Sequence, residues 1–368
     1  MLTVPTPTRN VEADVKWSRR EYLFDGKIII KRFRMFGEGR RPFLRALRYF
    51  LCEIVQFHYM LWKDYDVAFI DSTPPIQGLK LPIVRLFRKK GIVYNAQDLF
   101  PETLTGSGLA NQGGFLWKIG MWVSNVSFRN SDKIIAISND IKRSMVARGV
   151  PAEKIEVVYN WVDEKAVYPV LKLENPLFEE FYLSRDKFTV VYAGNLGNAQ
   201  NISVIVEAAK QMPDIQFAVF GTGGLEDELK AQIAKEGISN LNLNPLQPVE
   251  RVSQVYSLGD ICIVSCKAGL GGSAMPSKTW SIMSCGRPVL ASFDEGELKD
   301  IIEKNDCGVF THAGNVDEFV AAIEMLSKSP ERCEEMGKNA RQFILNNLTK
   351  EVGTKKYIDI IKQFEKKR

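Results

Sequence analysis

The chain is 368 residues long, and 45% of its residues are hydrophobic and 25% are charged. These fractions are typical of globular domains and exclude collagen-like, disordered and disulfide-scaffold proteins. A single hydrophobic core stops growing at about 250–300 residues, so this length predicts two domains.

Six cysteines and two histidines are scattered along the sequence without the spacing of a metal site. This pattern predicts reduced, buried thiols, no bound metal and no catalysis by histidine. The most apolar segment, 49–62, is shorter than the roughly 20 residues of a membrane span, and Glu53, Gln56 and His58 interrupt it. The first residues lack the basic start and apolar run of a signal peptide. We therefore expect a cytoplasmic protein.

Positive charge is concentrated in the first half of the chain. Residues 1–163 contain 25 Lys and Arg against 16 Asp and Glu, whereas the rest of the chain has a small net negative charge. This bias predicts an anionic partner for the first half, and a membrane surface, a phosphate-bearing lipid or a nucleic acid would fit. Since the sequence contains no recognition helix or stacking platform, nucleic acid is not expected.

Strands and helices alternate in the first half. The expected elements, in chain order, are helix 42–63, strand 65–71, helix 74–90, strand 92–95, helix 114–130, strand 133–138, helix 139–148 and strand 155–159. Such alternation is typical of a parallel sheet with right-handed crossovers.

The alternation stops after Asn160, and residues 163–187 contain two prolines and no clear period, which predicts a domain linker. The alternation then resumes with strand 188–193, helix 199–211, strand 215–220, helix 225–236, strand 241–243, helix 249–257, strand 261–265, helix 277–284, strand 288–292 and helix 297–304. Three further helices are expected at 316–327, 331–346 and 350–366.

The pattern predicts an α/β protein with two Rossmann-like domains, parallel sheets and a cleft between the domains, where ligands bind at the carboxyl ends of the strands. We assign 1–162 to the first domain, 163–187 to the linker, 188–345 to the second domain and 346–368 to a C-terminal helix. Because a βαβ unit takes about 30 residues, the first domain is expected to lack its first strand–helix unit.

The helix expected at 42–63 has an apolar face. The apolar positions are Phe43, Leu47, Phe50, Leu51, Ile54, Phe57 and Leu61. One interpretation is a crossover helix that packs this face against the sheet. The other keeps that packing and adds a basic rim that contacts anionic lipid. The rim would consist of Arg40, Arg41, Arg45 and Arg48.

Two glycine turns follow predicted strands. One contains Gly194 and Asn195, and the other contains Gly221 and Gly223. Each is either a phosphate contact or a plain turn. Neither has the three spaced glycines of a dinucleotide fingerprint, so a nicotinamide cofactor is not expected.

The loop at 265–276 is rich in glycine and leads into a helix that begins with Pro-Ser-Lys-Thr. Ser277, Lys278 and Thr279 provide a cation and two hydroxyls at this helix start, which suits a diphosphate. The alternative is a surface loop with a solvated lysine. The glycine spacing differs from that of a Walker loop.

The order of these motifs resembles that of the retaining glycosyltransferases of family four, which have the GT-B fold. The bacterial branch that builds O-antigens, capsules and exopolysaccharides, including the L-fucosamine transferases, is the most similar. The segments that carry the resemblance cover nearly the whole chain: DSTPP (71–75), YNAQDLFPETL (94–104), KIIAIS (133–138), GVPAEKIEVVYNWVD (149–163), AGN (193–195), FGTG (220–223) and PSKTWSIMSCGRPVLAS (276–292).

The resemblance implies that the second domain binds a nucleotide-sugar donor, with UDP preferred, and that the first binds a polyprenyl-diphosphate-linked or saccharide acceptor. It also implies transfer with retention, no metal or cofactor, and a C-terminal helix that crosses back to the first domain. A hexosyl or N-acetylhexosaminyl transferase that is peripheral at the inner face of the cell membrane would fit these expectations.

The resemblance also implies roles for individual residues. Lys278 would stabilise the leaving diphosphate, and Glu297 would bind ribose or sugar hydroxyls. Asp98 and Glu102 would face the cleft, or else be acidic residues in the first turn of a helix. The other donor-binding residues would be Gly194, Asn195, Gly221, Gly223, Ser277 and Thr279.

The sequence departs from the family pattern at several positions. Two family glutamates are replaced by Ser273 and Ser281, and the family's basic pair is replaced by Asn195 and Gln200. Lys278 is therefore the main candidate cation, and Arg287 is the second. A catalytically silent partner subunit and a nucleotide-sugar epimerase are the alternative functions.

Overall fold

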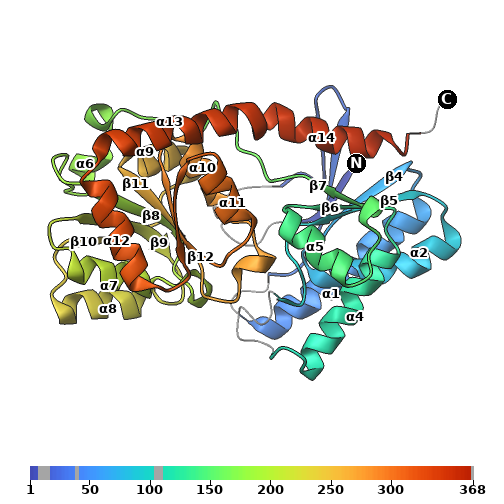
Figure 1. Cartoon of the computed structure of the whole chain (residues 1–368). Helices are drawn as coiled ribbons and strands as arrows, with labels where there is room; N and C mark the ends of the chain where they lie inside the picture. Colours follow the sequence, from blue (N-terminus) through green and yellow to red (C-terminus); the bar gives the residue numbers. More distant parts are fainter. Residues whose placement is uncertain (7–16, 38–40, 103–110, 366–368) are drawn as a thin grey trace. The chain divides into compact units, whose positions relative to one another are not determined.

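The computed structural model describes residues 1–6, 17–37, 41–102 and 111–365, and the chain forms two compact units (Figure 1). The first unit comprises Met1–Gln97, Ile119–Ile134 and Phe364–Arg368, and the second comprises Asp98–Lys118 and Ile135–Gln363. The main division therefore falls near residue 134, whereas the sequence predicts boundaries at 162 and 188. The predicted α/β class, with helices and parallel strands, is confirmed.

A small mixed sheet opens the first unit. Strand β1 (Leu2–Pro5) runs parallel to β3 (Ile28–Phe33), and β2 (Arg20–Leu23) runs antiparallel to β3. The sequence pattern does not predict β2 or β3. Asp25 and Gly26 both have positive φ in the turn between these strands. This Asp-Gly pair is the sequence signal that could have identified the hairpin.

A four-stranded sheet follows, with the strand order β4-β5-β6-β7. Its strands are β4 (Val67–Asp71), β5 (Gly91–Ala96), β6 (Lys133–Ala136) and β7 (Ile155–Val157). Each was expected within a few residues of its observed bounds. The accompanying helices are α1 (Pro42–Trp62), η1 (Pro75–Lys80), α2 (Leu81–Phe87), α4 (Phe115–Arg129) and α5 (Asn139–Ala147).

Helix α1 exposes much of the apolar face that the sequence predicts to be buried. Its exposed large apolar side chains include Phe43, Leu47, Phe50, Ile54 and Trp62. The buried side instead carries Arg48, Cys52, Glu53 and Met60, and Glu53 accepts a hydrogen bond from Lys80 of η1 (2.5 Å). The amphipathic period predicts the helix correctly, but the packing partner decides which face is buried, and the period does not identify that partner.

The four arginines predicted to form a basic rim have different environments. Arg40 lies outside the described residues, Arg41 is exposed and Arg45 is half-buried. Arg48 is buried, and its guanidinium donates to two backbone oxygens of residues that precede α1, at 2.7 and 2.8 Å. Arg48 therefore has a structural role, and the predicted lipid contact is wrong for this residue.

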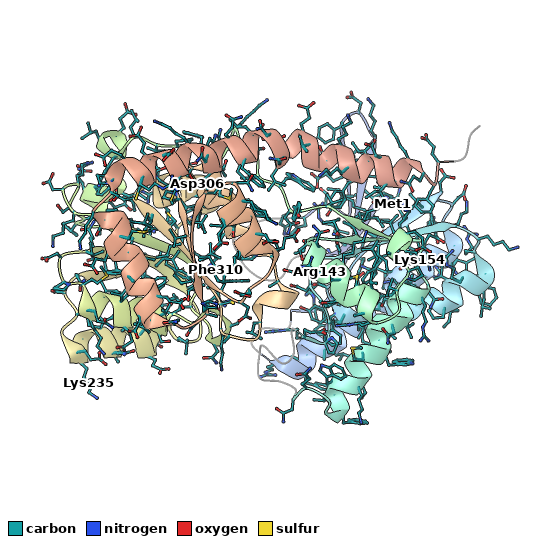
Figure 2. The ribbon with its side chains drawn as sticks, viewed as in Figure 1. Met1, Arg143, Lys154, Lys235, Asp306 and Phe310 are labelled. Atoms are coloured by element: carbon teal, nitrogen blue, oxygen red, sulfur yellow. The ribbon has the colours of Figure 1, made fainter. Side chains whose placement is uncertain are left out.

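The second unit contains a six-stranded parallel sheet with the order β10-β9-β8-β11-β12-β13. The sequence predicts all of these strands except β13, whose Phe310 is labelled in Figure 2. The strands are β8 (Thr189–Asn195), β9 (Gln216–Thr222), β10 (Leu241–Asn244), β11 (Ile261–Ser265), β12 (Val289–Phe293) and β13 (Gly308–His312).

Helices cover both faces of this sheet (Figure 1). They are α7 (Ser203–Gln211), α8 (Glu226–Glu236), α9 (Val252–Ser257), α10 (Lys278–Ser284), α11 (Glu297–Lys304), α12 (Val316–Ser327) and α13 (Pro330–Asn347).

The order of the strands reverses direction at β8. Strands β9 and β10 lie on one side of β8, and strand β11 lies on its other side. The carboxyl ends of β8 and β11 therefore form a topological switch point, where doubly wound sheets bind their ligands.

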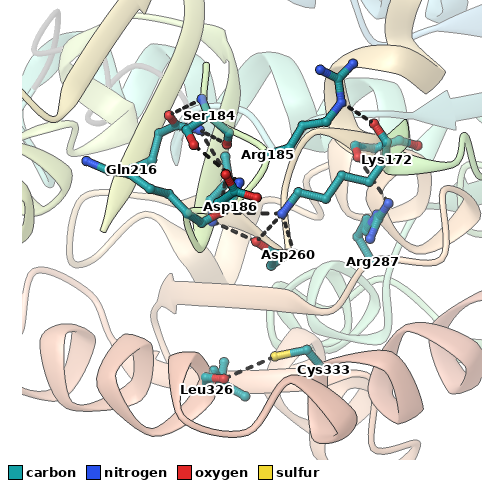
Figure 3. A network of polar contacts seen from close by, with 12 residues as sticks. Lys172, Ser184, Arg185, Asp186, Gln216, Asp260, Arg287, Leu326 and Cys333 are labelled. Atoms are coloured by element: carbon teal, nitrogen blue, oxygen red, sulfur yellow. Dashed lines mark hydrogen bonds and ion pairs between the residues drawn. The ribbon is translucent and has the colours of Figure 1, made fainter. Parts of the chain in front are cut away.

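The segment predicted as a linker, 163–187, is attached to the opposite end of this sheet (Figure 3). Lys172 Nζ lies 3.4 Å from both carboxylate oxygens of Asp260, which directly precedes β11. Asp260 also accepts a hydrogen bond from the backbone N–H of Thr189 (2.7 Å), the first residue of β8. Arg185 Nε donates to the backbone oxygen of Lys172 (3.1 Å). These bonds hold the segment against the amino ends of the two central strands.

The chain ends with α14 (Lys350–Lys362). Thr349 caps its start by accepting from the backbone N–H of Val352 (3.2 Å), and the ring centroids of Tyr357 and Trp161 are 5.1 Å apart. Beyond the helix, Phe364 belongs to the first unit and packs on Gly91 there, where a Cβ would lie 2.4 Å from the phenylalanine ring.

Candidate functional site

Loops from three strands meet at the switch point. The end of β9 lies so close to the end of β8 that a Cβ at Gly221 would lie 2.5 Å from the backbone oxygen of Gly194, its partner in the strand register. A Cβ at Gly223 would lie 2.4 Å from the backbone oxygen of Leu196. The hydroxyl of Ser265, the last residue of β11, donates a hydrogen bond to the backbone oxygen of Gln200, which follows β8 (2.6 Å). Gly221 and Gly223 thus permit this close packing, and their contact with a donor stays a prediction.

Lys278, the first residue of α10, lies over the end of β8. Its Nζ is 4.2 Å from the centroid of the Tyr192 ring, and a Cβ at Gly194 would lie 2.7 Å from Nζ. Gly194 also has a φ of 146°, a conformation that favours glycine. Burial lowers the pKa of Lys278 to about 8. No carboxylate in the described part of the chain lies within ion-pair distance of this ammonium group.

The predicted neighbours of Lys278 differ in their exposure. Asn195 and Ser277 are exposed, and Asn195 Nδ2 donates to Gln200 Oε1 (3.1 Å). Thr279 is fully buried, and its hydroxyl has no hydrogen-bond partner among the described residues. Because protein encloses the Thr279 side chain, the predicted role of this hydroxyl in capping a diphosphate is wrong.

The carboxylate of Glu297 already has partners within the second unit. It accepts hydrogen bonds from the backbone N–H of Asn139 (2.5 Å), from the Asn139 amide and from the Tyr159 hydroxyl. In return, Asp140 accepts from the backbone N–H of Glu297 (2.8 Å). Each acidic residue thus caps the helix on which the other lies, α5 or α11. Glu297 has a capping role in this structure, and a ribose or sugar hydroxyl would have to compete with these bonds.

Asp98 and Glu102 do not join Lys278 in an ion pair in the regions that the structure describes. Asp98 is exposed. Glu102 pairs with Arg148, which also donates to the backbone oxygen of Phe100 (3.0 Å). The pair with Arg148 gives Glu102 a structural partner, and the catalytic role predicted for Asp98 and Glu102 stays a prediction.

Arg287, the second candidate cation, lies at the amino end of the strands and away from the switch point. Its Nη2 donates to the backbone oxygen of Ser257 (3.0 Å). Together with Lys172 and Asp260 it lines a cavity of about 670 Å³ (Figure 3). The geometry therefore separates Arg287 from Lys278 and leaves Lys278 as the cation at the switch point.

The described ranges contain neither a metal-binding cluster nor a membrane-spanning helix. Residues 1–6, 17–37, 41–102 and 111–365 bring no three His, Cys, Asp or Glu side chains together in a geometry that could hold a metal ion. None of the helices in these ranges has the length and apolar character needed to cross a bilayer. All six cysteines are buried and none of them forms a disulfide bond, as the sequence predicts.

Tyr192 is the residue of this site that the sequence does not predict. It lies two residues before Gly194, so both residues lie on the same face of β8. An aromatic hydroxyl within the apolar run Val190–Ala193 is the signal that could have identified it. Its contact with Lys278 depends on how α10 packs on β8, which no local pattern encodes.

Two family models match the chain. The model of Glycosyltransferase Family 4 matches residues 5–166, and the model of Glycosyl transferases group 1 matches residues 176–343. The putative colanic acid biosynthesis glycosyl transferase WcaI of Escherichia coli K12 is 25% identical over 309 residues, which cover 82% of this chain and 74% of WcaI. The probable glycosyltransferase WbjE of Pseudomonas aeruginosa is 24% identical over 246 residues, which cover 66% of this chain but only 61% of WbjE.

Solved structures are similar in fold. Anabaena Alr3699/HepE in complex with UDP has a TM-score of 0.72 and 17% identity, over 91% of this chain and 86% of that chain. WaaG, a glycosyltransferase involved in lipopolysaccharide biosynthesis, has a TM-score of 0.67 and 14% identity, over 90% of this chain and 86% of that chain. The predicted GT-B fold is confirmed by these similarities. Together the two family models span almost the whole sequence, and each half of the chain matches a glycosyltransferase family model.

Proposed function

We propose that this protein transfers a hexosyl or N-acetylhexosaminyl group from a UDP-linked donor to a lipid-linked or saccharide acceptor in cell-surface polysaccharide biosynthesis. The ammonium group of Lys278 carries the proposal. It lies at the switch point of the second-unit sheet, is partly withdrawn from water, and has no carboxylate partner in the described residues. A cation in this state gains strongly from a diphosphate, because charge-assisted hydrogen bonds are the strongest in proteins.

The relatives support the substrate class. WcaI is named for colanic acid biosynthesis, and Alr3699/HepE has been solved with UDP and with UDP-glucose. These names favour a UDP-linked donor and a polysaccharide product. The L-fucosamine branch and retention of configuration belong to the proposal through the sequence resemblance.

Lys278 acts on the leaving group in this proposal. As the bond between the anomeric carbon and the diphosphate oxygen breaks, negative charge grows on that oxygen, and a positioned cation stabilises it. The acceptor hydroxyl forms its bond on the same face of the sugar, and its proton passes to the departing diphosphate. The exposed amide of Asn195 and the hydroxyl of Ser277 add hydrogen bonds. Because Lys278 supplies the cation, the proposal includes neither a metal ion nor another cofactor.

The first domain would bind the acceptor, which is polyprenyl-diphosphate-linked or a saccharide, next to an anionic membrane surface. Arg41 and Arg45 remain the basic candidates for this surface. The exposed Phe43, Phe50 and Trp62 of α1 add the apolar side chains that an interfacial helix inserts. A peripheral protein at the inner face of the cell membrane would follow.

Calorimetric titration of the full chain with UDP, GDP and dTDP tests the donor site. We expect UDP to bind, and NMR of the product formed from UDP-sugars should show retention. Failure to bind any of the three nucleotides at millimolar concentration would contradict the proposal.

A catalytically silent partner subunit is the second candidate function. Ser281 replaces a family glutamate, and the carboxylate of Glu297 is held by the protein. This alternative predicts that UDP binds but that no donor is turned over with any acceptor. An assay with and without the products of neighbouring biosynthetic genes separates the two functions.

A further inference from the structure

The aromatic ring of Tyr192 lies directly against the ammonium group of Lys278. The tyrosine is 0% exposed, and the 4.2 Å between its ring centroid and Nζ lies within the range of a cation–π interaction. The Tyr192 hydroxyl donates to the backbone oxygen of Asn195 (2.7 Å), which fixes the orientation of the ring. Gly194 lies on the same face of β8 and leaves space for the ammonium, since a Cβ there would be 2.7 Å from Nζ.

An aromatic ring and a carboxylate hold a lysine in different ways. A carboxylate forms a neutral pair with the ammonium, as Glu53 does with Lys80 in the first unit (2.5 Å). A ring orients the ammonium but adds no net charge, so the full positive charge remains for a ligand. We propose that Tyr192 is a positioning residue that holds the charged Lys278 ammonium toward the donor diphosphate. This inference rests on the proposed function.

The surroundings of Lys278 make this role measurable. Burial alone lowers its pKa to about 8, and no charged group among the described residues contributes to the shift. Removal of the ring should lower the pKa of Lys278 further, because the cation then loses its remaining stabilisation. A bound diphosphate should raise the pKa, because it favours the charged form of the lysine.

The experiment measures UDP affinity by calorimetry in the full chain with Tyr192→Phe, Tyr192→Leu, Lys278→Met and the double change Tyr192→Leu/Lys278→Met. Phenylalanine keeps the ring and should bind UDP nearly as well as the wild type. Leucine should bind UDP about tenfold more weakly, the scale of a desolvated cation–π contact. In the Tyr192→Leu variant, UDP affinity should also begin to fall at a lower pH than in the wild type. In the Lys278→Met background the leucine change should have no further effect, because no ammonium remains to be positioned.

A second series keeps the inference testable if the buried leucine variant does not fold. Phenylalanine with increasing ring fluorination at position 192 weakens the attraction for a cation at nearly constant shape. UDP affinity should fall stepwise along this series in the wild-type background and stay constant with Lys278→Met. Constant affinity in both backgrounds, or equal losses in both, would overturn the inference. If the wild-type chain binds no nucleotide, the proposed function itself is rejected. If UDP binds but its affinity does not depend on the ring at position 192, only the role of Tyr192 is rejected.

Discussion

Two lysines, Lys80 buried and Lys278 half-buried, show that the two units give a shielded cation different partners. Lys80, in η1 of the first unit, donates to Glu53 (2.5 Å) and Gln56 (3.1 Å). Lys278, in the second unit, faces an aromatic ring and has no carboxylate partner in the described residues. Burial lowers the pKa of both lysines, but only for Lys80 does a neighbouring carboxylate oppose the shift. The presence of a carboxylate partner, rather than shielding from water, therefore distinguishes a structural lysine from a lysine that is available to a ligand.

The largest expected effect is on stability, through Lys80→Met. The change leaves the carboxylate of Glu53 buried without its cation, which costs about 3 kcal/mol of unfolding free energy. Urea denaturation followed by circular dichroism measures the loss. The double change Lys80→Met/Glu53→Leu should recover most of it, since no buried charge remains. If the Lys80→Met chain is as stable as the wild type, the pair between Lys80 and Glu53 does not have the structural role assigned to it.

The next effect concerns turnover. Lys278→Ala should lower the rate of sugar transfer by about 10²-fold or more, the scale on which one preorganised group at a developing charge acts. The melting temperature should barely change, because no ion pair is broken. Lys267→Ala, an exposed lysine in the loop after β11, is the matched control and should keep full activity. Equal losses of transfer activity in Lys278→Ala and Lys267→Ala would show that catalysis depends on the total positive charge of this region and not on the position of Lys278.

The two units also differ in how much of their structure the sequence predicts. Strands β8, β9 and β11 are buried along most of their length, and fully buried parallel strands form continuous apolar runs that are easy to recognise. Strand β13 ends in Phe-Thr-His and lacks such a run. In the first unit, β2 alternates exposed and half-buried residues and β3 is half-buried after its exposed first residue, so neither strand forms a fully buried apolar run.

The candidate site was predictable only in part, and for a similar physical reason. Lys278 follows from local chemistry, because a cation at a helix start after a glycine-rich loop suits a phosphate. The role of Tyr192, the burial of Arg48 and the capping bond of Glu297 all depend on partners distant in sequence, up to 158 residues away for Glu297. Spacing along the chain carries no information about such partners.

A smaller effect is expected in the pH dependence of UDP binding. The diphosphate binds the charged form of Lys278, so affinity should be full below the pKa of about 8 and fall as pH rises above it. The fall should be about tenfold between pH 8 and pH 9.5. Calorimetry across this range measures it, and Lys278→Met is the control because its affinity should be low and lack this dependence. An unchanged affinity in the wild type would mean that the ammonium does not contact the diphosphate.

The smallest effect is expected at α1, where Arg41 and Arg48 repeat the contrast between the two lysines. Arg41 is exposed, whereas the guanidinium of Arg48 is held by backbone oxygens. Arg41→Ala should weaken binding to anionic vesicles about fivefold, since each basic residue near such a surface contributes roughly 1 kcal/mol. Sedimentation with vesicles of anionic lipid measures this loss, which should shrink with added salt because exposed charges are screened beyond about 8 Å at physiological ionic strength. Arg48→Ala should instead lower the melting temperature, because it removes a buried side chain that donates hydrogen bonds to two backbone oxygens. A wild-type chain that ignores anionic vesicles at low salt would show that Arg41 is only a solvated residue, and the acceptor would then have to reach the first domain from solution.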